Sequence, residues 1–320
     1  MRKIISFIDK VIFKKGNLLF YLFVITCFLH QINSNILIID LIGNLGKQIF
    51  IGGILLFVIL IFLKRYLLSL ASVFVLIIFA IKGLYPCDNC TAVLKNKLLN
   101  DFKLRLMTFN TGFYRSNNDE FKKIEKAILS ENIDIILFQD ISTNTLENLK
   151  KLKSIFPYGT NLNKPVNFWG SVILSKIPLE NSKLDNNVNQ SILILNNEKI
   201  TILGVHLFLP VTQDFLHHAL NQLDYLKTIS KKTNNHLIII GDLNMTSTSR
   251  RYINFIKETN LFTYSSFKNI TSTWPSFLPN LLGIQIDHII FSEKFKLKQK
   301  KILKNFSSDH RPIIFELYKG

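Results

Sequence analysis

Hydrophobic and polar positions follow two different patterns along the chain, one before and one after about residue 84. The first part is largely apolar: residues 16–39 contain no Asp, Glu, Lys or Arg, and further apolar runs occupy residues 48–63 and 66–81. An apolar helix of about 20 residues spans the hydrocarbon core of a bilayer, whereas a cleaved signal peptide has a single short apolar region. We therefore predict a helical membrane anchor over residues 1–83 with about three transmembrane helices, two being the alternative.

Basic residues predict the orientation of this anchor. Lys64 and Arg65 separate the second and third apolar runs, Lys47 separates the first from the second, and five basic residues precede the first run: Arg2, Lys3, Lys10, Lys14 and Lys15. Because loops rich in Lys and Arg stay on the cytoplasmic side, the N-terminus is predicted to be cytoplasmic. Three crossings would place everything after Lys82 on the outer side, and two crossings would reverse this.

After a predicted linker at residues 84–102, short apolar segments of β type recur. Two stretches instead have helical character, Asn118–Ser130 and Gln213–Lys232, because their apolar residues recur at helical spacing. Many strands with few helices indicate an α+β protein built from layered sheets. Eight segments are predicted to be strands: residues 104–109, 133–139, 170–175, 191–195, 200–208, 236–243, 286–292 and 312–317.

Polar side chains stand at the ends of six of these strands. A single Asp or Asn in such a place is usually turn chemistry. Six ends of this kind in one chain instead indicate oxygen ligands for a Mg²⁺-type ion, together with imidazoles for proton transfer or charge stabilisation. The residues are Asn110, Gln139, Asp140, His206, Asp242, Asn244, Asp287, His288, Asp309 and His310.

In their order, these segments resemble the endonuclease/exonuclease/phosphatase (DNase I-like) superfamily. The matching blocks are LRLMTFNTG, DIILFQD, GSVILSKIPL, ILGVHL, IIIGDLN, IDHIIFS and SSDHRPIIF, over about residues 103–318. The stretch STWPSFLPNLLGIQIDHIIFS, with the apolar N-terminal part, resembles a membrane-anchored bacterial branch of that family. The resemblance implies a four-layer α/β/β/α sandwich over residues 103–320 that hydrolyses phosphoric esters.

The resemblance also implies that Asn110, Asp140 and Asp309 hold a divalent metal, Mg²⁺ or Mn²⁺. The family usually has Glu where this chain has Asp140, and the missing methylene leaves the carboxylate about 1.5 Å nearer the backbone. Since the other blocks are intact, we expect an active phosphodiesterase or nuclease-like enzyme that cleaves by metal-assisted in-line attack of water. The alternative is a membrane-bound binding module with weak or no catalysis.

The implied catalytic roles fall on five further residues. Asp242 would orient or deprotonate the attacking water, and Asn244 would position the scissile phosphate. His310, oriented by Asp287, would contact the phosphoryl oxygens or transfer a proton. His206 would donate to the phosphate or to the leaving oxygen. In-line displacement at phosphorus needs charge neutralisation and a positioned nucleophile, which this set supplies.

Three features bear on the substrate and the location. After residue 90 the chain has 30 Lys and Arg against 19 Asp and Glu, and this excess favours an anionic partner. The loop at residues 273–282, TWPSFLPNLL, could line the substrate cleft or touch the membrane interface, and Trp274 is the predicted substrate contact. The anchor favours a phospholipid or sphingolipid headgroup or an extracellular nucleic acid over chromosomal DNA. We predict a multi-pass protein of the bacterial inner membrane whose catalytic domain faces the periplasm or the cell exterior.

Overall fold

The computed structural model describes residues 2–84, 103–112, 118–163, 170–185, 187–233, 236–264 and 271–319. The chain forms two compact units, residues 1–87 with 246–253 and residues 88–245 with 254–320. The predicted linker at residues 84–102 lies, apart from Leu84, outside the described residues.

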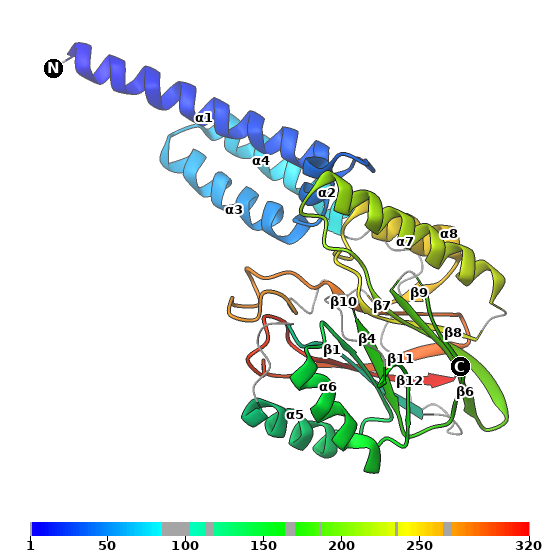
Figure 1. Cartoon of the computed structure of the whole chain (residues 1–320). Coiled ribbons are helices and arrows are strands. Elements are labelled where there is room, and N and C mark those ends of the chain that lie inside the picture. The colour runs from blue at the N-terminus through cyan, green and yellow to red at the C-terminus, as the bar shows by residue number, and fades with distance from the viewer. Residues whose placement is uncertain are drawn as a thin grey trace. The chain divides into compact units, whose positions relative to one another are not determined.

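Helices make up the apolar N-terminal segment: α1 (Arg2–His30), α2 (Leu37–Gly43), α3 (Gly46–Phe62), α4 (Tyr66–Phe79) and the short π-helix η1 (Ala80–Leu84) (Figure 1). Helices α1, α3 and α4 pack against one another. Gly53 of α3 allows this approach, because a Cβ atom there would lie 2.5 Å from the side chain of Leu76 and 2.6 Å from that of Phe23. The turn at Lys64 and Arg65 falls between α3 and α4, where the pattern predicts it.

The N-terminal helices differ in whether their length and apolar composition suffice to cross a membrane. By length and composition, one described helix, Tyr66–Leu84, could cross a bilayer, and α2 with α3 could count as a second span although they are bent by 74°. The apolar helical segment Gly16–Leu29 is shorter. The apolar run at residues 16–39 does not form a single helix, because α1 ends at His30. In the polar turn that follows, Ser34 Oγ accepts the Ile36 amide at 3.1 Å, a local bond that competes with helical pairing.

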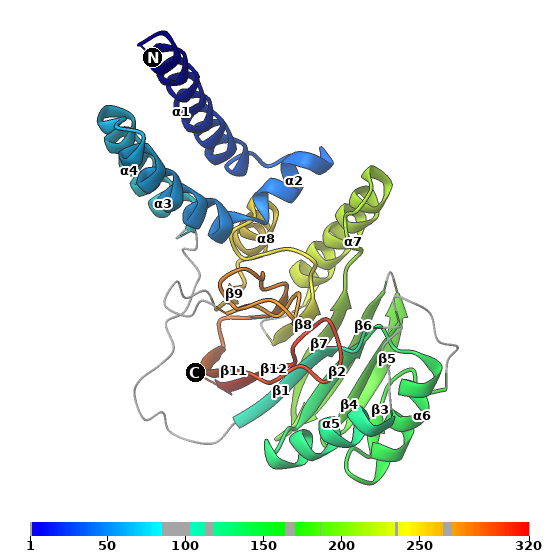
Figure 2. The ribbon, with the colours of Figure 1, turned by 90° about the vertical axis from the view of Figure 1, so that its left-hand side faces the viewer.

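Two six-stranded mixed sheets form the second unit. The strand order is β11-β12-β1-β2-β4-β3 in the first sheet and β5-β6-β7-β8-β10-β9 in the second. Helices α5 (Asn118–Ser130) and α6 (Thr143–Lys151) cover the outer side of the first sheet, and α7 (Gln213–Lys232) lies on the other side of the layers (Figure 2). The strands are β1 (Lys103–Asn110), β2 (Ile135–Gln139), β3 (Tyr158–Gly159), β4 (Ser171–Ser175), β5 (Leu179–Asp185), β6 (Val188–Leu195), β7 (Glu198–His206), β8 (Leu237–Asp242), β9 (Phe262–Thr263), β10 (Asp287–Phe291), β11 (Phe295–Ile302) and β12 (Ile313–Lys319).

Strand β2 shows why its sequence is apolar at every position. Successive side chains of a strand point to opposite faces of the sheet. Ile135 and Leu137 therefore enter the core between the two sheets, whereas Ile136 and Phe138 enter the core beneath α5 and α6. All four side chains are at most 1% exposed, so the central strands are covered on both faces and position the polar residues at their ends.

The eight predicted strands correspond to β1, β2, β4, β6, β7, β8, β10 and β12, and α5 and α7 have the predicted bounds. These elements confirm the predicted α+β class. The edge strands β5 and β11 are absent from the prediction because their sequences, LENSKLD and FKLKQKKI, are rich in polar residues and only partly buried. Helices α6 and α8 (Arg250–Thr259) are also absent from it, since both are short and rich in polar residues.

Candidate active site

Strand pairing brings the predicted site residues to one end of the two sheets. In the second sheet, His206 at the end of β7 is the register partner of Asp242 at the end of β8. Asp242 is in turn the register partner of Asp287 at the start of β10. In the first sheet, Asn110 at the end of β1 pairs with Gln139 at the end of β2. Hydrogen bonding of the backbone therefore fixes the spacing of these side chains.

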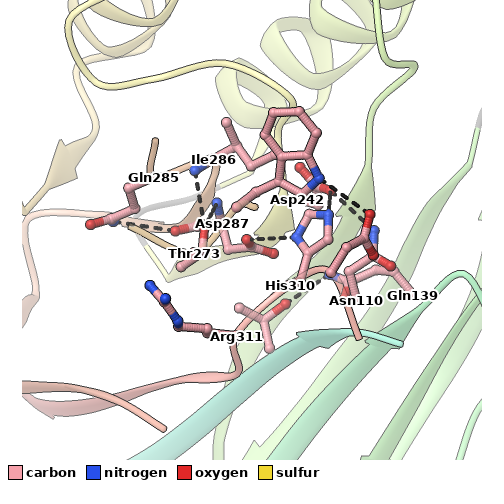
Figure 3. A network of polar contacts seen from close by, with 12 residues as sticks. Asn110, Gln139, Asp242, Thr273, Gln285, Ile286, Asp287, His310 and Arg311 are labelled. Carbon is pink, nitrogen blue, oxygen red and sulfur yellow. Dashed lines mark hydrogen bonds and ion pairs between the residues drawn. The ribbon is translucent and has the colours of Figure 1, made fainter. Parts of the chain in front are cut away.

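His310 lies between two aspartates of the second sheet (Figure 3). Its Nδ1 atom is 3.1 Å from Asp287 Oδ2, and its Nε2 atom is 3.7 Å from Asp242 Oδ2. All three residues are buried. Burial by itself lowers the pKa of His310, but the charge and hydrogen bond of Asp287, with the charge of Asp242, outweigh it and raise the pKa to about 9. The imidazole is therefore a cation at neutral pH.

Asn110 links the two sheets at this point. Its Nδ2 donates to Asp242 Oδ2 at 3.2 Å, across from β1 to β8, and its Oδ1 accepts the Gly112 amide at 3.0 Å. Its backbone carbonyl accepts the Ser308 hydroxyl at 2.8 Å, and the same hydroxyl oxygen accepts the His310 amide at 3.0 Å. Ser308 thus ties the loop that carries His310 to the end of β1.

Asn244 follows β8 in a turn that Asp242 stabilises. The Asn244 backbone has a positive φ of 48°, a conformation that asparagine tolerates better than most residues. Its amide N–H donates to Asp242 Oδ1 at 2.8 Å, and its side-chain Nδ2 donates to the Leu207 carbonyl at 2.7 Å. Burial and the charge of Asp287 raise the pKa of Asp242, which suits a carboxylate that accepts a proton.

His206 and Asp140 form a second pair beside Asp242. His206 Nδ1 lies 3.4 Å from Asp140 Oδ1, and His206 Nε2 lies 3.9 Å from Asp242 Oδ2. Burial, followed by the positive charge of His310, lowers the pKa of His206 to about 3, so this imidazole is neutral at pH 7. Burial raises the pKa of Asp140 to about 7, against the hydrogen bond from Asn110, and the charge of Asp309 contributes to the increase.

Asp309 faces the loop that contains Trp274. Its Oδ2 accepts the indole Nε1–H of Trp274 at 3.2 Å, and its backbone carbonyl accepts the Ser276 amide at 2.7 Å. Arg311 holds the same loop, since its guanidinium donates to the carbonyls of Ser272, Ser276 and Leu278 and to the side chain of Asn280. The predicted substrate contact therefore lies next to a predicted metal ligand, in a loop fixed by the residue after His310.

Two polar residues of the predicted strand ends have structural positions. His288 is buried, and its Nε2 lies 2.9 Å from the Met245 carbonyl, as expected for a side chain on the strand face opposite to Asp287. The Gln139 side chain is fully buried and donates to Thr108 Oγ1 at 2.7 Å.

Two arrangements of donor atoms could hold a divalent ion. The first, Asp242, Asp287 and His310, is the one group of three His, Cys, Asp or Glu residues in the described part of the chain whose ligand atoms lie within 4.8 Å of one another. A hydrogen bond between Asp287 and His310 already joins two of these ligand atoms. In the second, Asp140 Oδ1 is buried and has no hydrogen-bond partner among the described residues, while the charge of Asp309 acts on the same carboxyl. A cation fits a buried carboxylate of this kind, so Asn110, Asp140 and Asp309 remain the predicted metal ligands.

The sequence pattern gave no role to Ser308 or Arg311, although both stand in the block SSDHRP. Ser308 joins β1 to the His310 loop, and Arg311 makes its hydrogen bonds with a loop that precedes it by about 30 residues in sequence. Thr273 belongs to the same class, because its Oγ1 accepts the amides of Ile286 and Asp287 at 3.2 and 3.4 Å (Figure 3). For Ser308 and Arg311, the signal available in the sequence was their position within a polar block. Their hydrogen-bond partners depend on the fold.

Comparisons with known proteins show the family of this chain. The model of the Endonuclease/Exonuclease/phosphatase family matches residues 107–310, a range that contains all the catalytic and metal-binding residues predicted above. No curated protein sequence matches the chain.

Several solved structures share the fold at low sequence identity. The crystal structure of D. rerio TDP2 complexed with single strand DNA product has a TM-score of 0.55 and 15% identity over 68% of this chain and 100% of its own. An endonuclease/exonuclease/phosphatase from Bacteroides vulgatus has the same TM-score and identity over 69% and 100% of the two chains. SmcL has a TM-score of 0.52 and 16% identity over 68% and 99%. At these identities the likeness shows the fold alone.

Proposed function

The chain belongs to the endonuclease/exonuclease/phosphatase family of phosphoric ester hydrolases, and we propose that it is a divalent-metal-dependent phosphodiesterase tethered to a membrane by its N-terminal helices. The observation that carries this proposal is the buried imidazolium of His310, hydrogen-bonded to Asp287 and close to Asp242. A cationic donor at this place is suited to a phosphate ester, whose charge increases as the nucleophile attacks.

Each side chain of the site has a separate role in the proposed hydrolysis. Because Nδ1 of His310 is directed at Asp287, its Nε2 is the donor toward a phosphoryl oxygen. Asp242, whose pKa is raised, accepts the proton of the attacking water. Asn244, held beside Asp242, positions the phosphate, and neutral His206 donates to the phosphate or to the leaving oxygen. A divalent cation held by Asn110, Asp140 and Asp309 would supply neutralisation of the phosphate charge.

The substrate is proposed to be a phosphodiester of a nucleic acid or of a lipid headgroup. The basic composition after residue 90 supports an anionic polymer or surface. The D. rerio TDP2 structure with a single strand DNA product supports the nucleic acid, and the N-terminal helices support the lipid. In either case Trp274 is proposed to contact the substrate, and its half-buried position and its hydrogen bond to the proposed metal ligand Asp309 support this role.

A hydrolysis panel tests this proposal. The full chain, in detergent micelles, is assayed with Mg²⁺ or Mn²⁺ against single- and double-stranded DNA, RNA, sphingomyelin and phosphatidylinositol, with EDTA and the His310→Ala variant as controls. We expect turnover of one class that requires the metal and is lost in the variant. Turnover that never exceeds the His310→Ala control, with any metal, would contradict the enzyme and favour a binding module.

The membrane placement needs a separate experiment. We propose that the N-terminus is cytoplasmic and that three crossings deliver the catalytic unit to the outer side, as the distribution of basic residues indicates. A reporter that is active only outside the cytoplasm, fused after Lys97, is expected to be active. A cytoplasmic signal would contradict three crossings and would make intracellular nucleic acid accessible to the enzyme.

A further inference from the structure

The pair formed by Asp140 and His206 is not explained by the roles given so far. We propose that His206 is itself a ligand of the catalytic cation, through Nδ1 and next to Asp140, and that the site therefore prefers Mn²⁺ and similar transition metals over Mg²⁺. This inference rests on the proposed metal-dependent function and adds to it the identity of a fourth ligand and the class of metal.

The backbone directs the Asp140 carboxylate toward His206. Asp140 has a positive φ of 50°. The Thr111 hydroxyl donates to its carbonyl at 2.8 Å, and the Thr111 amide donates to the Gln139 carbonyl at 2.9 Å. This turn at the end of β2 is therefore fixed on both of its carbonyls. From it, the short aspartate side chain reaches a position in which Oδ1 faces His206 Nδ1 at 3.4 Å.

The separation of the two atoms suits a shared cation better than a hydrogen bond. A hydrogen bond between a neutral ring N–H and a carboxylate oxygen is normally about 2.7–3.2 Å long. With metal–ligand bonds of about 2.0–2.2 Å, two neighbouring ligand atoms lie about 3.0 Å apart in octahedral and about 3.4 Å apart in tetrahedral geometry. The observed 3.4 Å falls in this range, and Asp140 Oδ1 has no hydrogen-bond partner among the described residues.

The type of donor then decides which metal is favoured. Mg²⁺ is bound in proteins mainly by oxygen atoms and water, whereas imidazole suits transition metals. The His206 side chain is 2% exposed, so it presents its ring to the site without competition from bulk water. A glutamate at position 140 would carry its carboxylate about 1.5 Å farther from the backbone. The carboxylate would then no longer keep its 3.4 Å spacing to His206 Nδ1, and we expect the cation to be held by oxygen ligands alone.

His310 provides the contrast within the same site. Its Nδ1 already has a carboxylate acceptor, Asp287 Oδ2, at 3.1 Å, which is close to hydrogen-bond length. A cation at His310 would have to replace that bond. The geometry therefore assigns the cation to the His206 side and leaves His310 to the phosphate.

The test is the electron spin echo envelope modulation of bound Mn²⁺, which detects a nitrogen atom coordinated directly to the ion. The full chain in detergent is stripped with EDTA and loaded with one equivalent of Mn²⁺. We expect a ¹⁴N modulation that changes to the ¹⁵N pattern when the protein is grown with ¹⁵N-histidine. The signal should disappear in His206→Gln, with Mn²⁺ affinity lowered about 10–100-fold, and persist in the matched variant His310→Gln.

Asp140→Glu gives a second readout that keeps the imidazole in place. In this variant we expect bound Mn²⁺ without the nitrogen signal, and a preference for Mn²⁺ over Mg²⁺, measured by calorimetry, that falls about tenfold. If His206→Gln fails to fold, the Asp140→Glu variant still tests the inference.

The outcomes separate this inference from the proposed function. Bound Mn²⁺ without nitrogen modulation in the wild type would overturn the inference and leave a metal-dependent enzyme standing. A signal lost in His310→Gln but kept in His206→Gln would overturn it too, by moving the cation to the Asp242–Asp287 side. If the wild type bound no Mn²⁺ at all, both this inference and the metal dependence of the proposed function would be contradicted.

Discussion

His206 and His310 are both buried, each lies between two aspartates, and both approach Asp242, yet their charges at neutral pH are opposite. His310 has a carboxylate at 3.1 Å, close enough for its charge and hydrogen bond to overcome the cost of burial. The nearest carboxylate to His206 is at 3.4 Å, and burial prevails. One hydrogen bond to a carboxylate, and the positive charge of His310 that acts on His206, therefore separate an imidazolium from a neutral imidazole.

Removing the charged imidazole should have the largest effect. The His310→Ala variant is expected to lose about 10³-fold in kcat, because both proton transfer and charge stabilisation depend on Nε2. The rate is measured under single-turnover conditions on whichever substrate the panel identifies. His288→Gln is the matched control, since this buried histidine contacts the Met245 carbonyl on the other face of β10, and it should keep the wild-type rate. Equal losses in both variants would show a structural effect.

Converting the His310 pocket into one like that of His206 should have the next largest effect. Asp287→Asn keeps the shape but removes the charge, so burial should lower the pKa of His310 from about 9. We expect about a 10²-fold lower rate at pH 7. Because the variant loses its imidazolium at a lower pH than the wild type, the difference in rate should grow as the pH rises from 6 to 9. A difference that stays constant over this range would contradict the role of Asp287.

A smaller effect is expected where Trp274 contacts Asp309. Trp274→Phe removes the indole N–H that bonds Asp309 Oδ2 at 3.2 Å but retains an aromatic ring. Losing a hydrogen bond to a charged group costs about 1.5 kcal/mol, so we expect the affinity for Mn²⁺ to be about tenfold lower in the variant. Calorimetric titration of the metal-free protein with Mn²⁺ should show this change. Unchanged affinity would indicate that Asp309 is not a ligand of the cation that binds Asp140.

The smallest response is expected from His206 itself when only the pH is changed. In NMR spectra of the metal-free protein grown with labelled histidine, the ring signals of His206 should not move between pH 5 and 8, because its pKa is about 3. Those of His310 should move only above about pH 8, with a pKa of about 9. The variants His206→Gln and His310→Gln assign the signals. If His206 and His310 both titrated near pH 6.5, the contrast between a neutral and a charged imidazole would be contradicted.

The central elements of the fold could be predicted because their physics is local. Strands such as β2 and β8 are apolar at consecutive positions, and α5 and α7 show apolar residues at helical spacing. The pattern therefore predicts which residues are buried in the strands and helices. The edge strands β5 and β11 could not be predicted in this way, since one pairing partner and partial exposure leave little hydrophobic signal. The break after His30 was missed because a long charge-free run resembles one helix.

The sequence by itself determined which chemistry the site contains: carboxylates, amides and imidazoles at the ends of apolar strands, in an order typical of one family. It could not determine how those groups share protons or ions. That His310 pairs with Asp287 while Asp140 faces His206 follows from strand register and from the turn at Asp140. Since the charge of a buried imidazole depends on its burial, its hydrogen-bond partners and the charges next to it, only the tertiary structure distinguishes the two histidines.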